Sequence, residues 1–228
     1  MSDIILSPSI MCADLVNLER DIKLIEDLGF ENIHVDIIDG KFSPSMPLGL
    51  ETIYRMREIT NLKFNFHIMS ENNLFFIQEA LNIGAYNITF HIETSIHVQK
   101  YIDLIKSKNV QVGIALNPAT SLNTLEYLYG QVDNITIMAI NPGFAGDSNE
   151  RPISYAMGKI KNLAKIRDKY NYKFNIQVDG RVSIERIAKL VQCGADNLVL
   201  GSTSLFRKGL SLEENKVAIL EEIKKGVK

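Results

Sequence analysis

The sequence predicts a single (β/α)8 barrel domain over residues 1–228. Two patterns carry this prediction. Eight short apolar runs each precede a longer stretch of helical period, and one helix-to-strand joint recurs at a fixed spacing. A content of 46% hydrophobic and 23% charged residues is typical of a well-packed domain. An open doubly wound sheet is the alternative, but the count of eight units and the lack of a Gly-x-Gly-x-x-Gly fingerprint argue against it.

The predicted strands are short runs rich in Ile, Val and Phe, as expected of parallel strands that are buried on both faces. In chain order they are Ile4–Ile10, Ile33–Ile37, Phe64–Ile68, Ile88–His91, Val110–Leu116, Ile135–Ile140, Phe174–Val178 and Leu198–Leu200.

A segment with apolar residues at every third or fourth position follows each run, which is the pattern of a helix with one buried face. The second of these segments has the weakest pattern. The predicted helices are Leu15–Leu28, Leu50–Ile59, Leu74–Leu81, Val98–Lys106, Leu122–Leu128, Ile153–Tyr170, Ile184–Val191 and Leu212–Lys225.

The recurring joint places a glycine at a helix end and an Asn at the next strand start. It occurs at Gly29, Gly84 and Gly194, and the spacings between these glycines are 55 and 110 residues. Two βα units in 55 residues would make four modules of the full chain, which fits a barrel of eight units. The glycines are explained by the left-handed conformation that commonly ends a helix.

Charge and composition exclude several classes of partner. The chain has 25 Lys and Arg against 27 Asp and Glu, and no run of five like charges, so no nucleic-acid partner is expected. No apolar stretch approaches the ~18 residues that span a membrane, and Met1–Pro8 does not resemble a signal peptide. We therefore expect a cytoplasmic protein without a membrane partner. Cys12 and Cys193 form no CxxC pair and are expected to be reduced, small core residues.

Polar residues at strand ends mark the candidate site, because chemistry in a barrel lies where strands end. His34 and Asp36 are two apart on one strand, so both side chains point to the same face. His67 ends the third strand and Asp179 the seventh. Two His and two carboxylates suit one divalent cation, such as Zn, Mn, Fe or Co, although a single His in a strand is more often a hydrogen-bonded core residue. Ser9, His91, Asn117 and Asn141 lie at equivalent strand ends, and Met11, Met69 and Met138 near them could form a pocket wall.

Three glycine-containing turns follow the last three strands. They are Gly143-Phe144-Ala145-Gly146, Gly180-Arg181 and Gly201-Ser202. Barrels commonly hold phosphate at such turns through backbone N–H groups, so a small phosphorylated substrate is expected. Each glycine could also serve its turn alone.

Several motifs together resemble the ribulose-phosphate 3-epimerase family over nearly the whole chain. They are Ser7-Pro8-Ser9-Ile10, Ile33-His34-Val35-Asp36-Ile37-Ile38-Asp39-Gly40, Phe66-His67-Ile68-Met69, Leu116-Asn117-Pro118, Asn141-Pro142-Gly143-Phe144 and Val178-Asp179-Gly180.

The resemblance implies a metal-dependent isomerase acting on a small phosphorylated ketose. It implies that His34, Asp36, His67 and Asp179 bind the metal and that Asp36 and Asp179 move protons. It also implies that Ser9 and His67 contact the substrate. The phosphate end would then bind at Gly143, Phe144, Ala145, Gly146, Gly180, Gly201 and Ser202. We also expect a homo-oligomer.

Three departures from the family pattern concern the substrate. Ile38 replaces a Met, Lys41-Phe42-Ser43-Pro44-Ser45 replaces HFxPN, and Arg181 replaces a Gly. Ser7–Cys12, Gly143–Gly146, the replacement at Arg181 and Gly201–Phe206 together resemble the branch that converts D-allulose 6-phosphate to D-fructose 6-phosphate. The alternative is epimerisation of D-ribulose 5-phosphate to D-xylulose 5-phosphate. Arg181 could contact the phosphate in a bidentate manner or be solvated.

Epimerisation at C3 needs a proton removed from one face of the substrate and returned to the other, so two bases, Asp36 and Asp179, are expected. The segment Gly40–Gly49 could close as a lid or be an ordinary surface loop. A sugar-phosphate decarboxylase or aldolase would need a lysine at a strand end, where this chain has Ile38. A non-catalytic sugar-phosphate-binding barrel is the alternative of another class.

Overall fold

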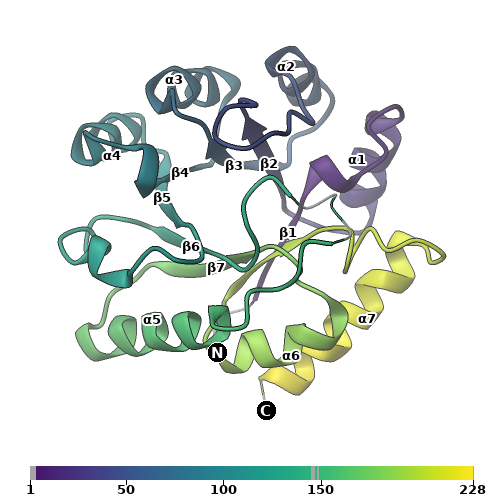
Figure 1. Cartoon of the computed structure of the whole chain (residues 1–228). Helices are drawn as coiled ribbons and strands as arrows, with labels where there is room; N and C mark the ends of the chain where they lie inside the picture. The colour runs from purple at the N-terminus through teal and green to yellow at the C-terminus, as the bar shows by residue number, and fades with distance from the viewer. Residues whose placement is uncertain (1–3, 145–146, 148, 228) are drawn as a thin grey trace.

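The computed structural model describes residues 4–144, 147 and 149–227. Eight parallel strands form one nearly closed barrel (Figure 1), with the sheet order β1-β8-β7-β6-β5-β4-β3-β2. A parallel bridge between Ser9 and His34 connects the two ends of this sheet. The strands are β1 Ile5–Pro8, β2 Asn32–Ile38, β3 Lys63–Met69, β4 Asn87–His91, β5 Gln111–Leu116, β6 Asn134–Met138, β7 Asn175–Asp179 and β8 Asn197–Leu200.

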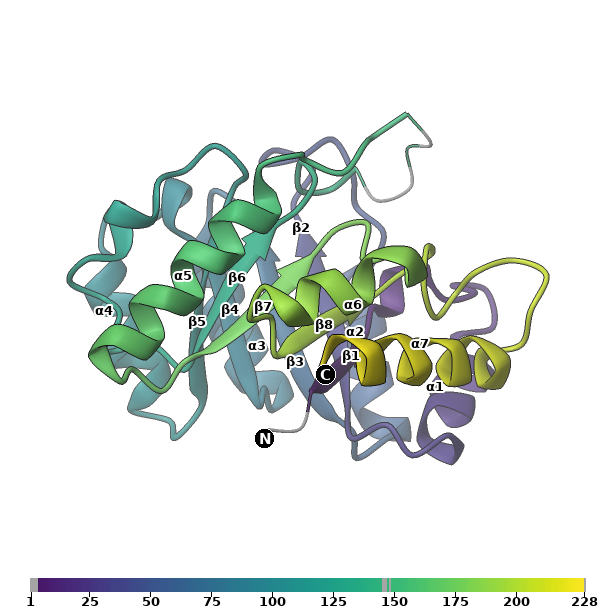
Figure 2. The same cartoon turned by 90° about the horizontal axis from the view of Figure 1, so that it is seen from below.

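The helices lie outside the strands (Figures 1 and 2), and the main apolar core fills the space between helices and barrel. The predicted (β/α)8 architecture is thus confirmed. The α-helices in the described part of the chain are α1 Leu18–Asp27, α2 Leu50–Ile59, α3 Asn73–Ile83, α4 Val98–Lys106, α5 Ala156–Tyr170, α6 Ile184–Gln192 and α7 Leu212–Gly226.

The helix predicted over Leu122–Leu128 is wrong. The structure has only the 3-10 helix η3, Leu122–Leu125, in its place. The Ser121 side chain caps its start, and the N–H groups of Thr124 and Glu126 donate to the carbonyl oxygens of Ser121 and Asn123 at 3.3 and 3.2 Å, bonds that span three residues. One tight turn already buries Leu125, so the apolar pattern is satisfied without an α-helix.

The glycine joints adopt the expected left-handed conformation. Gly29, Gly84 and Gly194 have φ of 73°, 92° and 102°. Their surroundings differ: a Cβ added at Gly194 would lie 2.5 Å from the Cβ of Ala164 on α5, whereas one added at Gly29 would meet nothing within 4 Å.

We expect Gly194→Ala to lower the free energy of unfolding by about 2–4 kcal/mol, because backbone strain adds to overpacking against Ala164. Gly29→Ala has the strain alone and should cost about 1 kcal/mol. Urea denaturation of both variants checks this difference through the midpoint at constant m-value. Equal losses would show that the contact with Ala164 relaxes freely.

A layer of buried amides fills the amino-terminal end of the barrel. Ser7 Oγ lies 2.8 and 3.0 Å from the side-chain oxygens of Asn32 and Asn197, and Asn65 donates to Asn32 at 2.7 Å. These bonds tie β1, β2, β3 and β8 together below the site, which helps to hold their carboxyl ends in register. No helix in the described residues has the length and apolar character to cross a membrane.

Candidate active site

Two His and two Asp side chains meet inside the barrel at the carboxyl ends of three strands. His34 and Asp36 lie on β2, His67 on β3 and Asp179 at the end of β7. One potential ligand atom from each lies within 4.8 Å of the others. The set converges because Asp36 and His67 are register partners on neighbouring strands, while only β1 and β8 separate β2 from β7. The structure therefore brings together the four residues that the sequence singled out.

The histidine nitrogens of this cluster face the carboxylates. His34 Nε2 lies 3.3 Å from Asp36 Oδ1 and 3.8 Å from Asp179 Oδ2. His67 Nδ1 lies 3.3 and 3.2 Å from the same two oxygens. Burial alone would lower the pKa of His67, but the adjacent carboxylates of Asp179 and Asp36 raise it to about 9. The cluster thus favours positive charge between its carboxylates.

Asp36 is held as a carboxylate. Its side chain is almost fully buried, and Ser9 Oγ donates to its Oδ2 at 2.9 Å. Burial alone would raise the pKa of Asp36, but His34 and His67 lower it well below its usual range. Ser9, which directly follows β1, therefore orients the Asp36 carboxylate.

The donor set fits a divalent cation. Both ring nitrogens of His34 and Nδ1 of His67 are buried and make no hydrogen bond within the described part of the chain. A buried polar atom without a partner is costly, and a metal ion would satisfy such nitrogens. Two imidazoles and two carboxylates without thiolate suit Zn, Mn, Fe or Co. His34, Asp36, His67 and Asp179 could therefore hold one such ion.

A third histidine and a glutamate extend the cluster behind His67. His67 Nε2 lies 2.9 Å from His91 Nε2, and His91 Nδ1 lies 3.2 Å from Glu93 Oε2. Burial lowers the pKa of His91 to about 4, so this ring is neutral at pH 7. His91 ends its strand, as the sequence predicts, whereas a role for Glu93 is not among the predictions. The two-residue spacing of His91 and Glu93 was the available signal.

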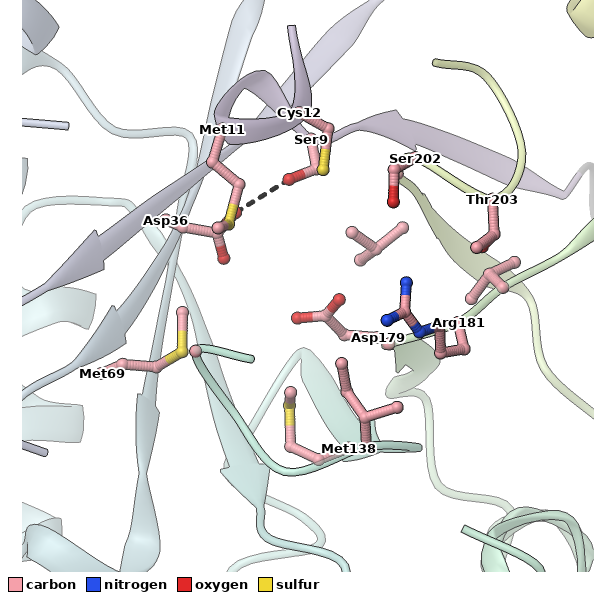
Figure 3. Close-up of a pocket in the computed structure, with 16 residues that line it drawn as sticks. Ser9, Met11, Cys12, Asp36, Met69, Met138, Asp179, Arg181, Ser202 and Thr203 are labelled. Carbon is pink, nitrogen blue, oxygen red and sulfur yellow. Dashed lines mark hydrogen bonds between the residues drawn. The ribbon is translucent and has the colours of Figure 1, made fainter. Parts of the chain in front are cut away.

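The pocket beside the cluster is walled by methionines and glycines. Met11, Met69 and Met138 line it, as expected from the sequence (Figure 3). Asp179 directs its carboxylate toward the side of the pocket that holds Asp36. The remaining lining residues include predicted ones, Ser9, Gly143, Gly180, Arg181, Gly201 and Ser202, and unpredicted ones, Cys12, Ile140, Val182, Val199 and Thr203.

Cys12 is not the core residue that the sequence suggested. It lies in the 3-10 helix Ile10–Cys12, is partly exposed and lines the pocket next to Ser9. Burial raises the pKa of its thiol to about 11, so it remains protonated and is no nucleophile at pH 7. Cys193 is also only partly buried. Both thiols are free, as expected.

The three glycine turns share the rim of the pocket only in part. Gly143, Gly180, Gly201 and Ser202 line it, whereas Phe144 is not among the described lining residues. Ala145 and Gly146 lie outside the described residues. Gly180 has φ 99°, and a Cβ there would lie 2.4 Å from the Ile140 side chain, so only glycine fits.

Arg181 is engaged by the loop that follows β6. Its Nε donates to the Glu150 carbonyl oxygen at 3.2 Å and its Nη2 to the Asp147 carbonyl oxygen. The side chain is thus held by two backbone carbonyls while it stays partly exposed, and its contact with phosphate stays a prediction. Glu150 in turn accepts from the backbone N–H and side-chain amide of Asn141 at 2.8 and 3.0 Å. Arg181 thus connects the turn after β7 to the loop after β6.

The segment 40–49 connects β2 to α2 and reaches the loop after β6 at Gly143. Its start is anchored at Asp39, whose carboxylate accepts from the backbone N–H groups of Lys41 and Phe42 at 2.9 and 2.8 Å. Ser43 is buried against Gly143, where a Cβ would lie 1.8 Å from Ser43 Oγ. Segment 40–49 therefore packs on the rim of the pocket, and its opening as a lid stays a prediction.

The fold and the site define a class of protein: a parallel barrel with a potential divalent-cation cluster beside a glycine-rimmed pocket. The chain belongs to the ribulose-phosphate 3-epimerase family, whose model matches residues 5–206. It is 32% identical over 197 residues to the ribulose-phosphate 3-epimerase of Treponema pallidum, covering 86% of this chain and 89% of that protein. It is 34% identical to the enzyme of that name from Bacillus subtilis, with the same coverage. 

A further relative is the chloroplastic ribulose-5-phosphate-3-epimerase of Arabidopsis thaliana. It is 35% identical over 203 residues, which cover 88% of this chain and 71% of the plant protein. Among solved structures, the 3-keto-L-gulonate-6-phosphate decarboxylase from Vibrio cholerae matches with a TM-score of 0.72 and 12% identity, covering 99% of each chain. That match supports the barrel fold alone.

Proposed function

We propose that this chain is a metal-dependent 3-epimerase that interconverts D-ribulose 5-phosphate and D-xylulose 5-phosphate. The observation that carries the proposal is the pair of carboxylates, Asp36 and Asp179, which reach one cluster from separate strands. Three relatives that carry the ribulose-phosphate or ribulose-5-phosphate 3-epimerase name support the reaction and the pentulose substrate.

The reaction requires two groups that exchange protons with C3 of the ketose. One carboxylate removes the proton next to the C2 carbonyl and leaves a planar enediolate. The other, in its protonated form, delivers a proton to the opposite face, and the two exchange roles in the reverse direction. Asp36, held ionised by His34 and His67 and oriented by Ser9, is suited to remove a proton.

A bound divalent cation would supply Lewis-acid stabilisation of the negative charge that develops on the substrate oxygens. His34, Asp36, His67 and Asp179 would hold it. The methionine wall and segment 40–49 would keep water away from the intermediate.

The hexulose phosphate expected from the sequence motifs becomes the second candidate. Its support is the resemblance at Ser7–Cys12, Gly143–Gly146, Arg181 and Gly201–Phe206. Arg181 holds the loop after β6, so it shapes the rim of the pocket where the two substrates would differ in length.

Comparing kcat/KM for D-ribulose 5-phosphate and D-allulose 6-phosphate on one enzyme preparation tests the proposal. A higher value for the pentulose is expected. A higher value for the hexulose phosphate would make it the substrate, and the proposed two-base epimerisation would stand. Tight binding of either sugar phosphate without turnover would favour the non-catalytic barrel. The cytoplasmic location and the homo-oligomer stay predictions.

The phosphate is proposed to bind backbone N–H groups at Gly143, Gly180, Gly201 and Ser202. Gly201 tests this because a Cβ there would lie 3.3 Å from Cys12 Sγ, inside the pocket. We expect Gly201→Val to raise KM about tenfold or more, since crowding of about 1–3 kcal/mol would fall on binding. Steady-state kinetics of the folded variant provide the measurement.

Gly158→Val on α5 is the control, because Gly158 is exposed and has open space around it. Its KM should equal that of the unmodified enzyme. An unchanged KM for Gly201→Val would contradict phosphate binding at Gly201, and the phosphate would then bind at another part of the rim.

A further inference from the structure

A series of side-chain contacts runs behind the cluster from Glu93 to His67. Glu93 contacts His91, His91 contacts His67, and His67 reaches the carboxylates of Asp36 and Asp179. Both histidine side chains are fully buried, so water does not compete for their nitrogens. The two rings are inclined by 21°, with centroids 5.1 Å apart and the facing nitrogens 2.9 Å apart. This geometry places the rings edge to edge, as an in-plane N–H···N bond requires.

The donor and acceptor in each contact from Glu93 to His67 follow from the Glu93 carboxylate. A carboxylate only accepts, so Glu93 requires a proton on His91 Nδ1. In the neutral ring of His91 the other nitrogen, Nε2, is then bare and accepts from His67 Nε2–H. With its proton on Nε2, the neutral ring of His67 has its lone pair on Nδ1, which is the nitrogen 3.2–3.3 Å from the two carboxylates.

We infer that Glu93, acting through His91, is a positioning residue that fixes His67 in the tautomer whose Nδ1 lone pair faces the divalent cation. The inference rests on the proposed metal site. A metal-binding histidine usually donates its second N–H directly to a carboxylate or a carbonyl. Here His91 lies between His67 and the carboxylate. Glu93 fixes the proton position on His91, and His91 in turn fixes it on His67.

The second oxygen of Glu93 fixes how a glutamine would sit at this position. Glu93 Oε1 accepts from the backbone N–H of Asn117 at 2.7 Å and from the Thr120 hydroxyl. The Asn117 N–H cannot reverse its role, so a glutamine would keep its amide oxygen there. Its amide NH2 would then face His91 Nδ1 and donate to it. That donation would reverse both histidines and place a proton on His67 Nδ1.

Titration with Co2+, followed by its visible absorption and by competition with Zn2+, tests the inference on the purified full chain. We expect Glu93→Gln to weaken Co2+ binding by about 10–100-fold, the range typical of residues that orient a metal-binding histidine. Glu71→Gln is the matched control. Glu71 follows β3 and is an exposed partner of Lys41. Its variant therefore removes one charge near the barrel mouth and leaves the contacts among Glu93, His91 and His67 unchanged. It should bind Co2+ as the unmodified protein does.

A double-mutant cycle separates the tautomer effect from local packing. His91→Gln places an amide oxygen near the former Nε2, where it can accept from His67 Nε2–H without help from Glu93. In that background Glu93→Gln should have little further effect on the Co2+ affinity, so the two changes should be non-additive. Thermal melts of the metal-free variants provide the structural control. Equal effects of Glu93→Gln in both backgrounds would overturn the inference.

The Zn2+-loaded unmodified protein gives a measurement that needs no Glu93 variant. In 15N-histidine NMR, His91 should carry its proton on Nδ1 and His67 on Nε2, with the His91 signals assigned by their loss in His91→Gln. A proton on His91 Nε2 would overturn the inference. If the unmodified protein binds neither Co2+ nor Zn2+, the proposed metal site itself fails. If it binds and Glu93→Gln binds equally well, only the role of Glu93 fails.

Discussion

Removal of divalent metal is expected to lower epimerase activity by at least about 10³-fold. The reaction places negative charge on the substrate oxygens next to Asp36 and Asp179, in a buried site where like charges repel strongly. Stabilisation of such charge by a cation is worth several kcal/mol, and each 1.4 kcal/mol changes the rate tenfold. Loss of the cation should therefore act on kcat more than on KM.

Exhaustive chelation, elemental analysis and separate re-addition of Zn2+, Mn2+, Fe2+ and Co2+ measure this effect. Re-addition should restore activity and identify the most effective ion. Circular dichroism before and after chelation controls for unfolding. Undiminished activity in a protein shown to be free of metal would remove His34 and His67 from any role as ligands.

The barrel could be predicted because its signals are local. Runs rich in Ile, Val and Phe are buried on both faces, and the glycines that end helices need positive φ whatever surrounds them. The prediction of a helix over Leu122–Leu128 was wrong because apolar periodicity does not distinguish one tight turn that buries Leu125 from a full α-helix. The predicted end of the first strand at Ile10 was wrong for a similar reason, because Ile10 begins the 3-10 helix Ile10–Cys12.

The cluster could be predicted because the barrel itself places strand ends together, so His34, Asp36, His67 and Asp179 needed only their positions along the chain. Loop contacts follow no such rule. The contacts of Arg181 with the loop after β6 depend on backbone carbonyls that no residue pattern marks. The same holds for Ser43 against Gly143.

Asp36→Asn and Asp179→Asn should each reduce epimerisation by roughly 10²–10⁴-fold, the range typical of a general acid–base group. Asn preserves size and one oxygen acceptor but cannot accept or deliver the C3 proton. The comparison requires equal metal content, because both carboxylates also face the histidine nitrogens of the cluster. Metal analysis of each purified variant therefore precedes the kinetics.

The stereochemistry of proton exchange then distinguishes the two carboxylates. If each serves one face of C3, each variant retains the base for only one epimer and, in D2O, should still exchange the C3 proton of that epimer slowly. The two variants should differ in which epimer exchanges, as read by NMR of the recovered sugar phosphates. Exchange of the same epimer by both metal-loaded variants, or epimerisation by either at the unmodified rate, would contradict the two-base assignment. A single base acting on an intermediate that turns within the pocket would then be required.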